Sequence, residues 1–407
     1  MTESSVSGRP APGAISVAAR SLAPDLARGA MLLFIALANA PGYLYGRPMG
    51  VRGYRIPDTI GDKVVVTLQM TIVDGRAYPM FALLFGYGLV QLLRRNTVAG
   101  VDAVTVRKLI RRRGWWLVLF GFMHALLLFS GDILGAYGLL AIMLAGMLTR
   151  VGDRTLLIMA TVWMVPVAML GALFDPSVPD HGTAATTAAP LEAAWERIGE
   201  WVPGLVLNSL ADLVPPLLLG VWAARRRLLD DPGPHRRLLT WVGVLGGGLA
   251  VIGGTPMALM AAYWWHAPSA GTVVLATVAH TVTGYAGGIG YAAIIGLVAI
   301  RVGGHRGVVV TALAACGQRS MTSYLLQSVV FVAVLAAYGG GLGNVLDVAP
   351  VAALATATWA MTVVLAEFMR RRGYRGPAEV LLRRLTYPRP YTGDRPLTVR
   401  SSTPASA

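Results

Sequence analysis

A single histidine, His124, interrupts a long apolar run that follows a cluster of basic residues. The segment 107–138 opens with RKLIRRR, passes a Trp pair, and stays apolar as far as Ser130 except for that histidine. If the segment is helical, the eleven residues from Arg113 to His124 cover roughly 16 Å, close to the middle of a hydrocarbon core about 30 Å thick. An imidazole at that depth is costly and usually faces a cavity, and a neutral imidazole can act as a general base. We therefore predict that His124 is catalytic.

Two further residues are predicted to act with this histidine. Asn39 follows Arg28 by the same interval that separates His124 from Arg113, so both side chains should lie at similar depth. Arg319 is the only Lys or Arg residue in the middle of a predicted span rather than near its end, and Arg319 or Asn39 could steady an oxyanion. The alternative for Asn39 is a hydrogen bond that holds two helices together.

Asp132 opens the next apolar run, eight residues after His124. Eight residues of helix cover roughly 12 Å, so we expect no direct contact between the two side chains unless the chain turns back there. Asp132 should lie at the outer mouth of the site, or cap the following helix. Asp74, Gly75 and Arg76 form a second charged group, which we interpret as a turn at the outer interface.

The remaining polar residues at membrane depth must find partners inside the protein. Asp212 is predicted to be protonated, exposed to water or paired with Arg319, and His280 is either a second base or a packing residue. Segment 316–328, which contains Gln327, carries so many polar side chains that it should line the bundle interior. The residues predicted to bind substrate are Asp132, Arg76, Asp74, Asp212, His280 and Gln327.

Composition limits the class of protein. The chain is 55% hydrophobic and 14% charged, against a usual quarter or so charged, which indicates an integral membrane protein in contact with a lipid bilayer. The net charge of +15 sits in short clusters between apolar runs, a pattern typical of topology anchors, and we predict no nucleic-acid partner. No Cys/His spacing resembles a zinc site, and Cys316 is the lone cysteine, so we predict no metal.

The pattern of apolar runs predicts an all-α polytopic fold with about ten transmembrane helices. The predicted spans are 28–45, 77–94, 109–130, 133–149, 155–174, 202–224, 239–262, 272–300, 308–337 and 348–369. Alternate connections hold most of the Lys and Arg residues, which places both termini in the cytoplasm. The ranges 1–24, 25–372 and 373–407 are predicted to be a disordered tail, the transmembrane domain, and a cytoplasmic amphipathic segment with its tail.

Several local features accompany this topology. Two of the later spans exceed the length that a membrane needs, so we expect tilt, or breaks at 287–290 and at Gly317. Residues 63–73 should form a short amphipathic helix at the interface. A helix after Gly376 and Pro377 should set its Arg residues against anionic headgroups. We expect the first helix to remain as a span rather than be removed as a signal peptide.

Five ordered motifs resemble the YeiB-like family of bacterial membrane proteins, domain of unknown function 418. They are DLARG at 25–29, FALLFGYGL at 81–89, RRRGWWLVLFGFMHALLLFSGDILGAYG at 111–138, GQRSMTSYLLQS at 317–328 and GPAEVLLRRLTY at 376–387. Such proteins are similar in their first helix to transmembrane acyltransferases of the heparan-α-glucosaminide N-acetyltransferase type.

That resemblance implies transfer of an acyl group from cytoplasmic acyl-coenzyme A to a glycan or lipid acceptor across the bacterial cytoplasmic membrane. In the relatives an Asn in the first helix and a His shortly after it belong to the site. Asn39 matches the Asn, but no His follows in residues 40–60, and we assign that part to His124. A small-molecule transporter or exporter with midplane acids is the alternative, and a membrane scaffold is a third possibility.

Overall fold

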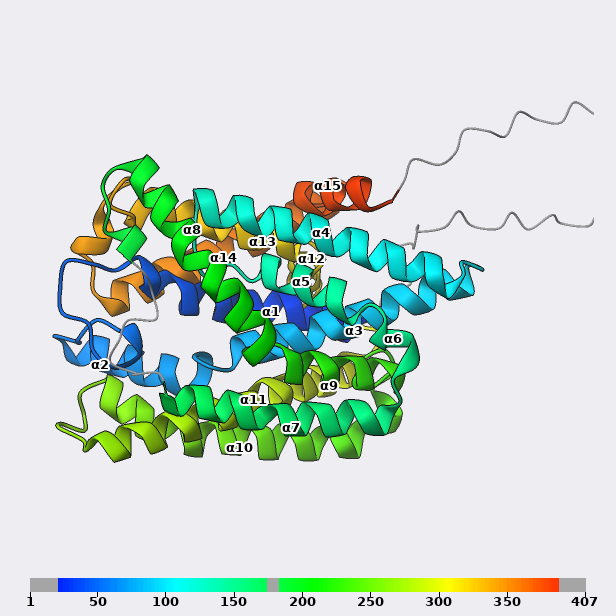
Figure 1. Ribbon diagram of the computed structural model, residues 1–407, viewed down its shortest axis with the longest axis horizontal. Helices are drawn as coiled ribbons and strands as arrows, with labels where there is room; N and C mark the ends of the chain where they lie inside the picture. The colour runs from blue at the N-terminus through cyan, green and yellow to red at the C-terminus, as the bar shows by residue number, and fades with distance from the viewer. Residues whose placement is uncertain (1–20, 174–182, 388–407) are drawn as a thin grey trace, which may run out of the picture.

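The computed structural model describes residues 21–173 and 183–387, and within them every regular element is helical. Figure 1 shows most of the long helices running along the longest axis of the molecule. In the first half the helices are α1 Leu22–Asn39, α2 Ile60–Leu68, α3 Ala77–Val98, α4 Ala103–Leu127, α5 Leu134–Leu144, α6 Met147–Arg150 and α7 Asp153–Leu173. In the second half they are α8 Pro190–Leu207, α9 Val214–Arg225, α10 Arg236–Ala261, α11 Ala270–Val302, α12 Val308–Gly317, α13 Ser320–Leu335, α14 Val348–Arg371 and α15 Pro377–Thr386.

Apolar helices of membrane length define the class of this fold. In the described ranges five helices, α1, α7, α10, α11 and α14, are long and apolar enough to cross a membrane, and the bent pair α8–α9 raises the number to six. Helices α5, α12 and α13 are apolar but shorter. The predicted spans 133–149 and 308–337 are each divided between two helices, so fewer helices than the predicted ten meet this standard.

One of the two predicted breaks is present. The chain breaks between α12 and α13 at Gly317, as expected. The predicted break at 287–290 is wrong, because α11 runs without interruption from Ala270 to Val302. The glycines there serve helix packing instead: a Cβ added to Gly287 would lie 2.7 Å from the Ala250 Cβ, and one added to Gly290 3.0 Å from the Gly247 nitrogen. Small residues of this kind let the backbones of α10 and α11 approach closely.

Helix α1 occupies the middle of the bundle, where it contacts α3, α11, α12 and α14 (Figure 1). Its closest approach is to α12. A Cβ added to Gly29 would overlap the carbonyl group of Leu313, and one added to Gly317 would overlap that of Asp25. Only glycine permits backbone contact at both positions. The glycines of the DLARG and GQRS motifs are therefore the crossing point of these two helices.

Both ends of the described chain contact the junction between α12 and α13. Gln318 Nε2 donates to Asp25 Oδ2 in the first turn of α1, at 3.0 Å. The Glu379 carboxylate on α15 accepts from the backbone amides of Met321 and Thr322, at 2.8 and 3.2 Å, in the first turn of α13. The start of α1 and the helix α15 therefore lie at the same end of the bundle.

The two predicted amphipathic segments are helical. Residues 60–68 form α2, and a π-helical turn, Gln69–Val73, extends it. Ile60, Val64, Leu68 and Ile72 are exposed at a spacing of four residues, which makes one apolar stripe along the helix. Helix α15 buries Leu382 against the bundle and leaves Leu381 and Arg384 outside.

The predicted N-terminal tail, 1–24, lies outside the described residues except for its last few positions, because α1 begins at Leu22. Residues 388–407 of the predicted C-terminal tail also lie outside the described residues.

Candidate functional site

His124 and Asp132 are in direct contact. His124 Nδ1 lies 3.0 Å from Asp132 Oδ1, and neither side chain has any exposed surface. The expectation that they would stay apart is wrong, because α4 ends at Leu127 and the chain turns back before α5 begins at Leu134. Eight residues that would cover roughly 12 Å in a helix instead form a reversal. Asp132 therefore belongs to a buried acid–histidine pair rather than to an outer mouth.

Asp132 also starts the next helix. Its Oδ2 accepts a hydrogen bond from the Gly135 amide at 2.7 Å, which satisfies one of the unpaired N–H groups at the start of α5. A Cβ added to Gly121 on α4 would collide with Asp132 Oδ2 and the backbone of Gly135. The missing side chain at Gly121 thus lets the start of α5 sit against α4, one turn before His124. The capping role suggested by the sequence is confirmed, and it coexists with the contact to His124.

Ser328 completes a line of three polar groups. Its Oγ lies 2.8 Å from His124 Nε2, on the side of the imidazole opposite Asp132, and 3% of Ser328 is exposed. The Tyr324 ring, one turn earlier on α13, packs 4.9 Å from the imidazole centroid. Ser328 was not singled out from the sequence, although the expectation that segment 316–328 lines the interior is confirmed by the burial of Ser323, Tyr324, Gln327 and Ser328.

Two buried polar atoms near this line have no hydrogen-bond partner among the described residues, and they are Tyr137 Oη and Gln327 Oε1. The Gln327 amide nitrogen is engaged, donating to the carbonyl of Leu32 on α1 at 3.3 Å. Buried polar atoms are nearly always paired, by protein or by a bound molecule. The cluster therefore has the capacity to bind a small polar group.

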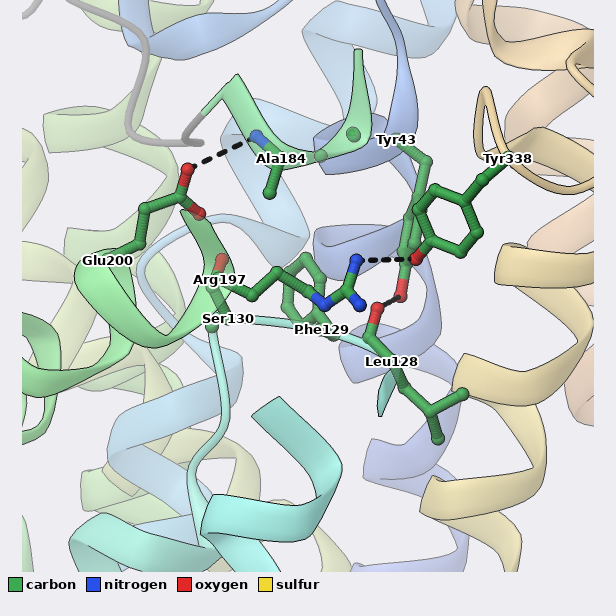
Figure 2. Close-up of a pocket in the computed structure, with 11 residues that line it drawn as sticks. Tyr43, Leu128, Phe129, Ser130, Ala184, Arg197, Glu200 and Tyr338 are labelled. Carbon is green, nitrogen blue, oxygen red and sulfur yellow. Dashed lines mark hydrogen bonds between the residues drawn. The ribbon is translucent and has the colours of Figure 1, made fainter. Parts of the chain in front are cut away.

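A cavity of about 40 Å³ lies beside the turn between α4 and α5 (Figure 2). Its lining residues are Gly42, Tyr43, Leu128, Phe129, Ser130, Gly131, Ala184, Ala185, Arg197, Glu200 and Tyr338. The Tyr43 and Phe129 rings stack 5.3 Å apart, and Tyr43 Oη donates to the Leu128 carbonyl at 3.2 Å. The sequence did not reveal this cavity, because its walls come from five separate segments of the chain.

Arg197 joins the cavity to the histidine-bearing helix. Its guanidinium donates to the carbonyls of Ala125 and Leu126, at 3.0 and 2.8 Å, in the last turn of α4 immediately after His124. It also donates to Tyr338 Oη at 2.8 Å. A cation at a helix C-terminus satisfies the free carbonyls and complements the helix dipole. A sequence signal existed, since Arg197 is the only Lys or Arg residue in the stretch 175–201.

Asp74, Arg76 and His280 form a second buried cluster. His280 Nε2 lies 2.9 Å from Asp74 Oδ2 and 3.0 Å from Arg76 Nη1, and Arg52 Nη2 lies 3.0 Å from the same carboxylate oxygen. Residues 74–76 form the predicted turn, with Gly75 at a φ of 72°, and Arg76 is fully buried and donates to the Ala250 carbonyl on α10. Burial raises the pKa of Asp74, but Arg52, His280 and Arg76 outweigh it and hold that pKa below its usual range.

Arg319 and Asp212 lie away from His124. Arg319 is the residue between α12 and α13, and its guanidinium donates to the carbonyls of Ala315 and Tyr374. Those contacts lie next to α15, so the alternative pairing of Arg319 with Asp212 is wrong. Asp212 ends the π-helical turn before α9, and its carbonyl accepts from Tyr285 Oη at 2.8 Å.

Asn39 ends α1, and no described hydrogen bond joins its side chain to His124. Tyr43, four residues later, stacks on Phe129, which follows His124 by five residues. As for metals, no three His, Cys, Asp or Glu side chains converge within residues 21–173 and 183–387.

The fold and the site define an all-helical protein with several apolar helices of membrane-spanning length. Residues 223–389 match the family described as a protein of unknown function, DUF418, which confirms the resemblance seen in the motifs. The uncharacterized protein YxaH of Bacillus subtilis (strain 168) is 28% identical over 342 residues, covering 76% of this chain and 78% of that protein. The uncharacterized protein YeiB of Escherichia coli (strain K12) is 35% identical over 128 residues, covering 30% of each.

Proposed function

We propose that the protein transfers an acyl group from acyl-coenzyme A to a hydroxyl or amine of a glycan or lipid acceptor. The observation that supports this proposal is the buried line of Asp132, His124 and Ser328, with contacts of 3.0 and 2.8 Å. A carboxylate on one imidazole nitrogen and a hydroxyl on the other is the arrangement that activates hydroxyl groups in acyl transfer on unrelated folds.

Each residue has a separate part in this chemistry. Asp132 holds the proton on His124 Nδ1, so that Nε2 keeps its lone pair and faces Ser328. An acceptor O–H or N–H in the place of that hydroxyl, or beside it, gives its proton to Nε2 as it attacks the acyl carbonyl. His124 then returns the proton to the leaving thiolate. Arg319 acts at the junction between α12 and α13, as a positioning residue rather than an oxyanion donor.

The topology proposed with this function has about ten spans and both termini in the cytoplasm of a bacterial cell, with the bilayer being the cytoplasmic membrane. The clusters of Lys and Arg in alternate connections support it. The shared position of the start of α1 and of α15 at one end of the bundle agrees with termini on one side. A single engineered cysteine at exposed His266 should react with an impermeant maleimide added to intact cells, whereas one at exposed His305 should react only after the membrane has been permeabilised.

The test of the function is transfer of a labelled acetyl group from acetyl-coenzyme A to lipid or glycan by membranes that contain the protein. Wild type should label an acceptor, and His124→Ala should abolish the labelling. His305→Ala removes an exposed histidine and is the matched control. Equal labelling by wild type and His124→Ala, or no labelling by wild type with any acceptor, would refute the proposal.

A transporter is the second candidate, supported by the broken pair α12–α13 and the bent pair α8–α9. Carriers use such interrupted helices and buried ionisable groups for substrate and proton sites. Proton-coupled uptake into vesicles that survives His124→Ala and fails in Asp212→Asn would favour this function. Uptake equal in both variants and in empty vesicles would exclude it.

A further inference from the structure

The cavity beside the turn between α4 and α5 is lined by two charged side chains, Glu200 and Arg197. Glu200 Oε1 accepts from the Ala184 amide at 3.2 Å, but Glu200 Oε2 is buried without a hydrogen-bond partner in the described chain. Arg197 is 5% exposed, and its described contacts are with carbonyl oxygens and the Tyr338 hydroxyl and ring rather than with a carboxylate. Figure 2 shows the Glu200 carboxylate on one side and the Arg197 guanidinium pointing the other way, toward Tyr338.

The Glu200 carboxylate and the Arg197 guanidinium would each bind a ligand group of opposite charge. A buried carboxylate oxygen without a donor is costly, and an ammonium group supplies both the missing hydrogen bond and the opposite charge. A buried guanidinium without a carboxylate is complemented by an anionic oxygen in the same way. The stacked rings of Tyr43 and Phe129 line the same cavity and add aromatic surface that favours an ammonium group.

We propose that this cavity binds a small zwitterion that carries a primary ammonium close to an anionic phosphate or carboxylate. The ammonium binds Glu200 Oε2 and the anionic group faces Arg197. The volume of about 40 Å³ accepts about three water-sized groups, enough for an aminoalkyl end but not for a sugar ring. The remainder of the ligand then extends out of the cavity.

The site also bears on acyl transfer, and this part of the inference rests on the proposed function. Arg197 binds the carbonyls that directly follow His124, so a ligand held between Arg197 and Glu200 lies next to the end of the catalytic helix. The ammonium gives one proton to the Glu200 carboxylate, and the neutral amine that results is the acceptor, whose attack on the acyl carbonyl forms an amide as the thioester C–S bond breaks. The second proton of the amine passes to His124 Nε2 and from there to the thiolate.

Binding is measured by calorimetry on the purified full chain in detergent, with O-phosphoethanolamine as the probe. Ethanolamine and inorganic phosphate each supply one of the two groups, and phosphocholine replaces the N–H donors with methyl groups. We expect O-phosphoethanolamine to bind at least about 10-fold more tightly than these three, because a charge-assisted hydrogen bond contributes about that factor or more. Equal affinities for all four compounds would overturn the proposal.

The variant that tests the site is Glu200→Gln, which keeps the shape of the side chain and removes its charge. It should weaken O-phosphoethanolamine binding by about 10- to 100-fold. Glu192→Gln, on the exposed side of the same helix, is the matched control and should bind as wild type does. Binding to Glu200→Gln at the wild-type affinity would contradict the assignment, provided that the two variants melt at the same temperature.

Two further experiments distinguish a lipid headgroup from a free zwitterion, and ligand binding from acyl transfer. If the zwitterion is a lipid headgroup, nanodiscs of phosphatidylethanolamine should raise the melting temperature above that in phosphatidylglycerol, and Glu200→Gln should abolish the difference. A free zwitterion should bind equally in both lipids. His124→Ala should keep wild-type binding while losing acyl transfer. Binding without any transfer by wild type would refute only the enzymatic proposal, and transfer with an unchanged KM in Glu200→Gln would refute only the cavity's role.

Discussion

A single methyl group added at Gly29 should destabilise the protein, because α1 and α12 touch there backbone to backbone. The added Cβ would lie 2.8 Å from the carbonyl carbon of Leu313 and closer still to its oxygen. Carbon atoms in contact sit about 3.5 Å apart or more, so the helices must separate by at least about 0.7 Å. Overpacking of this kind costs about 1–3 kcal/mol, against a gain of about 1 kcal/mol from replacing glycine by alanine in a helix. Since the obstacle is backbone, which yields less easily than a side chain, we expect Gly29→Ala to lose up to about 2 kcal/mol net.

The matched control is Gly247→Ala on α10, where an added Cβ meets nothing within 4 Å. The same chemical change should there stabilise the protein, by up to about 1 kcal/mol. Thermal unfolding of the purified proteins in detergent, followed by tryptophan fluorescence, measures both. Gly29→Ala should melt below wild type and Gly247→Ala at or above it. Equal melting temperatures for the two variants would refute the close crossing of α1 and α12.

Three other substitutions test separate contacts. Asp132→Asn should lower acyl transfer by about 10²- to 10⁴-fold, because His124 loses the carboxylate. The melting temperature should change little, because the amide oxygen of the new side chain still accepts from the Gly135 amide. A wild-type rate in the labelling assay would contradict this. Asp74→Asn should destabilise the protein by about 2 kcal/mol at pH 7. The depressed pKa of Asp74 means that its stabilisation is present above the usual value of about 4 and is lost as pH falls through the folded-state pKa, so urea unfolding of variant and wild type should converge in acid. Glu379→Gln should expose α15 to limited proteolysis earlier than Glu192→Gln does, and identical digestion would count against the docking of α15.

Periodicity and composition were enough to predict the helical class and the apolar segments. They could not predict where a helix breaks, because glycine occurs both where a helix is interrupted and where two helices pack closely. Gly317 does the first and also packs against α1, whereas Gly287 and Gly290 do only the second. The difference depends on which neighbour lies opposite, and that neighbour is distant in sequence.

The site shows the same limit at smaller scale. His124 was proposed as a site residue from its depth alone, and its contact with Asp132 was missed because rise per residue assumes a straight helix. Ser328 was one of several polar residues on its helix, and only the packing of α13 against α4 distinguishes it. Glu200 and Tyr338 carried no signal, since each stands in a connection or helix whose partner segments lie far away in the chain.

The capping of α13 by Glu379 has a consequence for how the chain is made. The carboxylate that accepts from the Met321 and Thr322 amides lies 57 to 58 residues further along the chain. During synthesis α13 therefore leaves the ribosome with these amides unsatisfied, and they gain their acceptor only when the last described helix emerges. The junction beside Arg319 is therefore completed only after Glu379 has been synthesised, and a chain that stops before Glu379 leaves the start of α13 without this carboxylate.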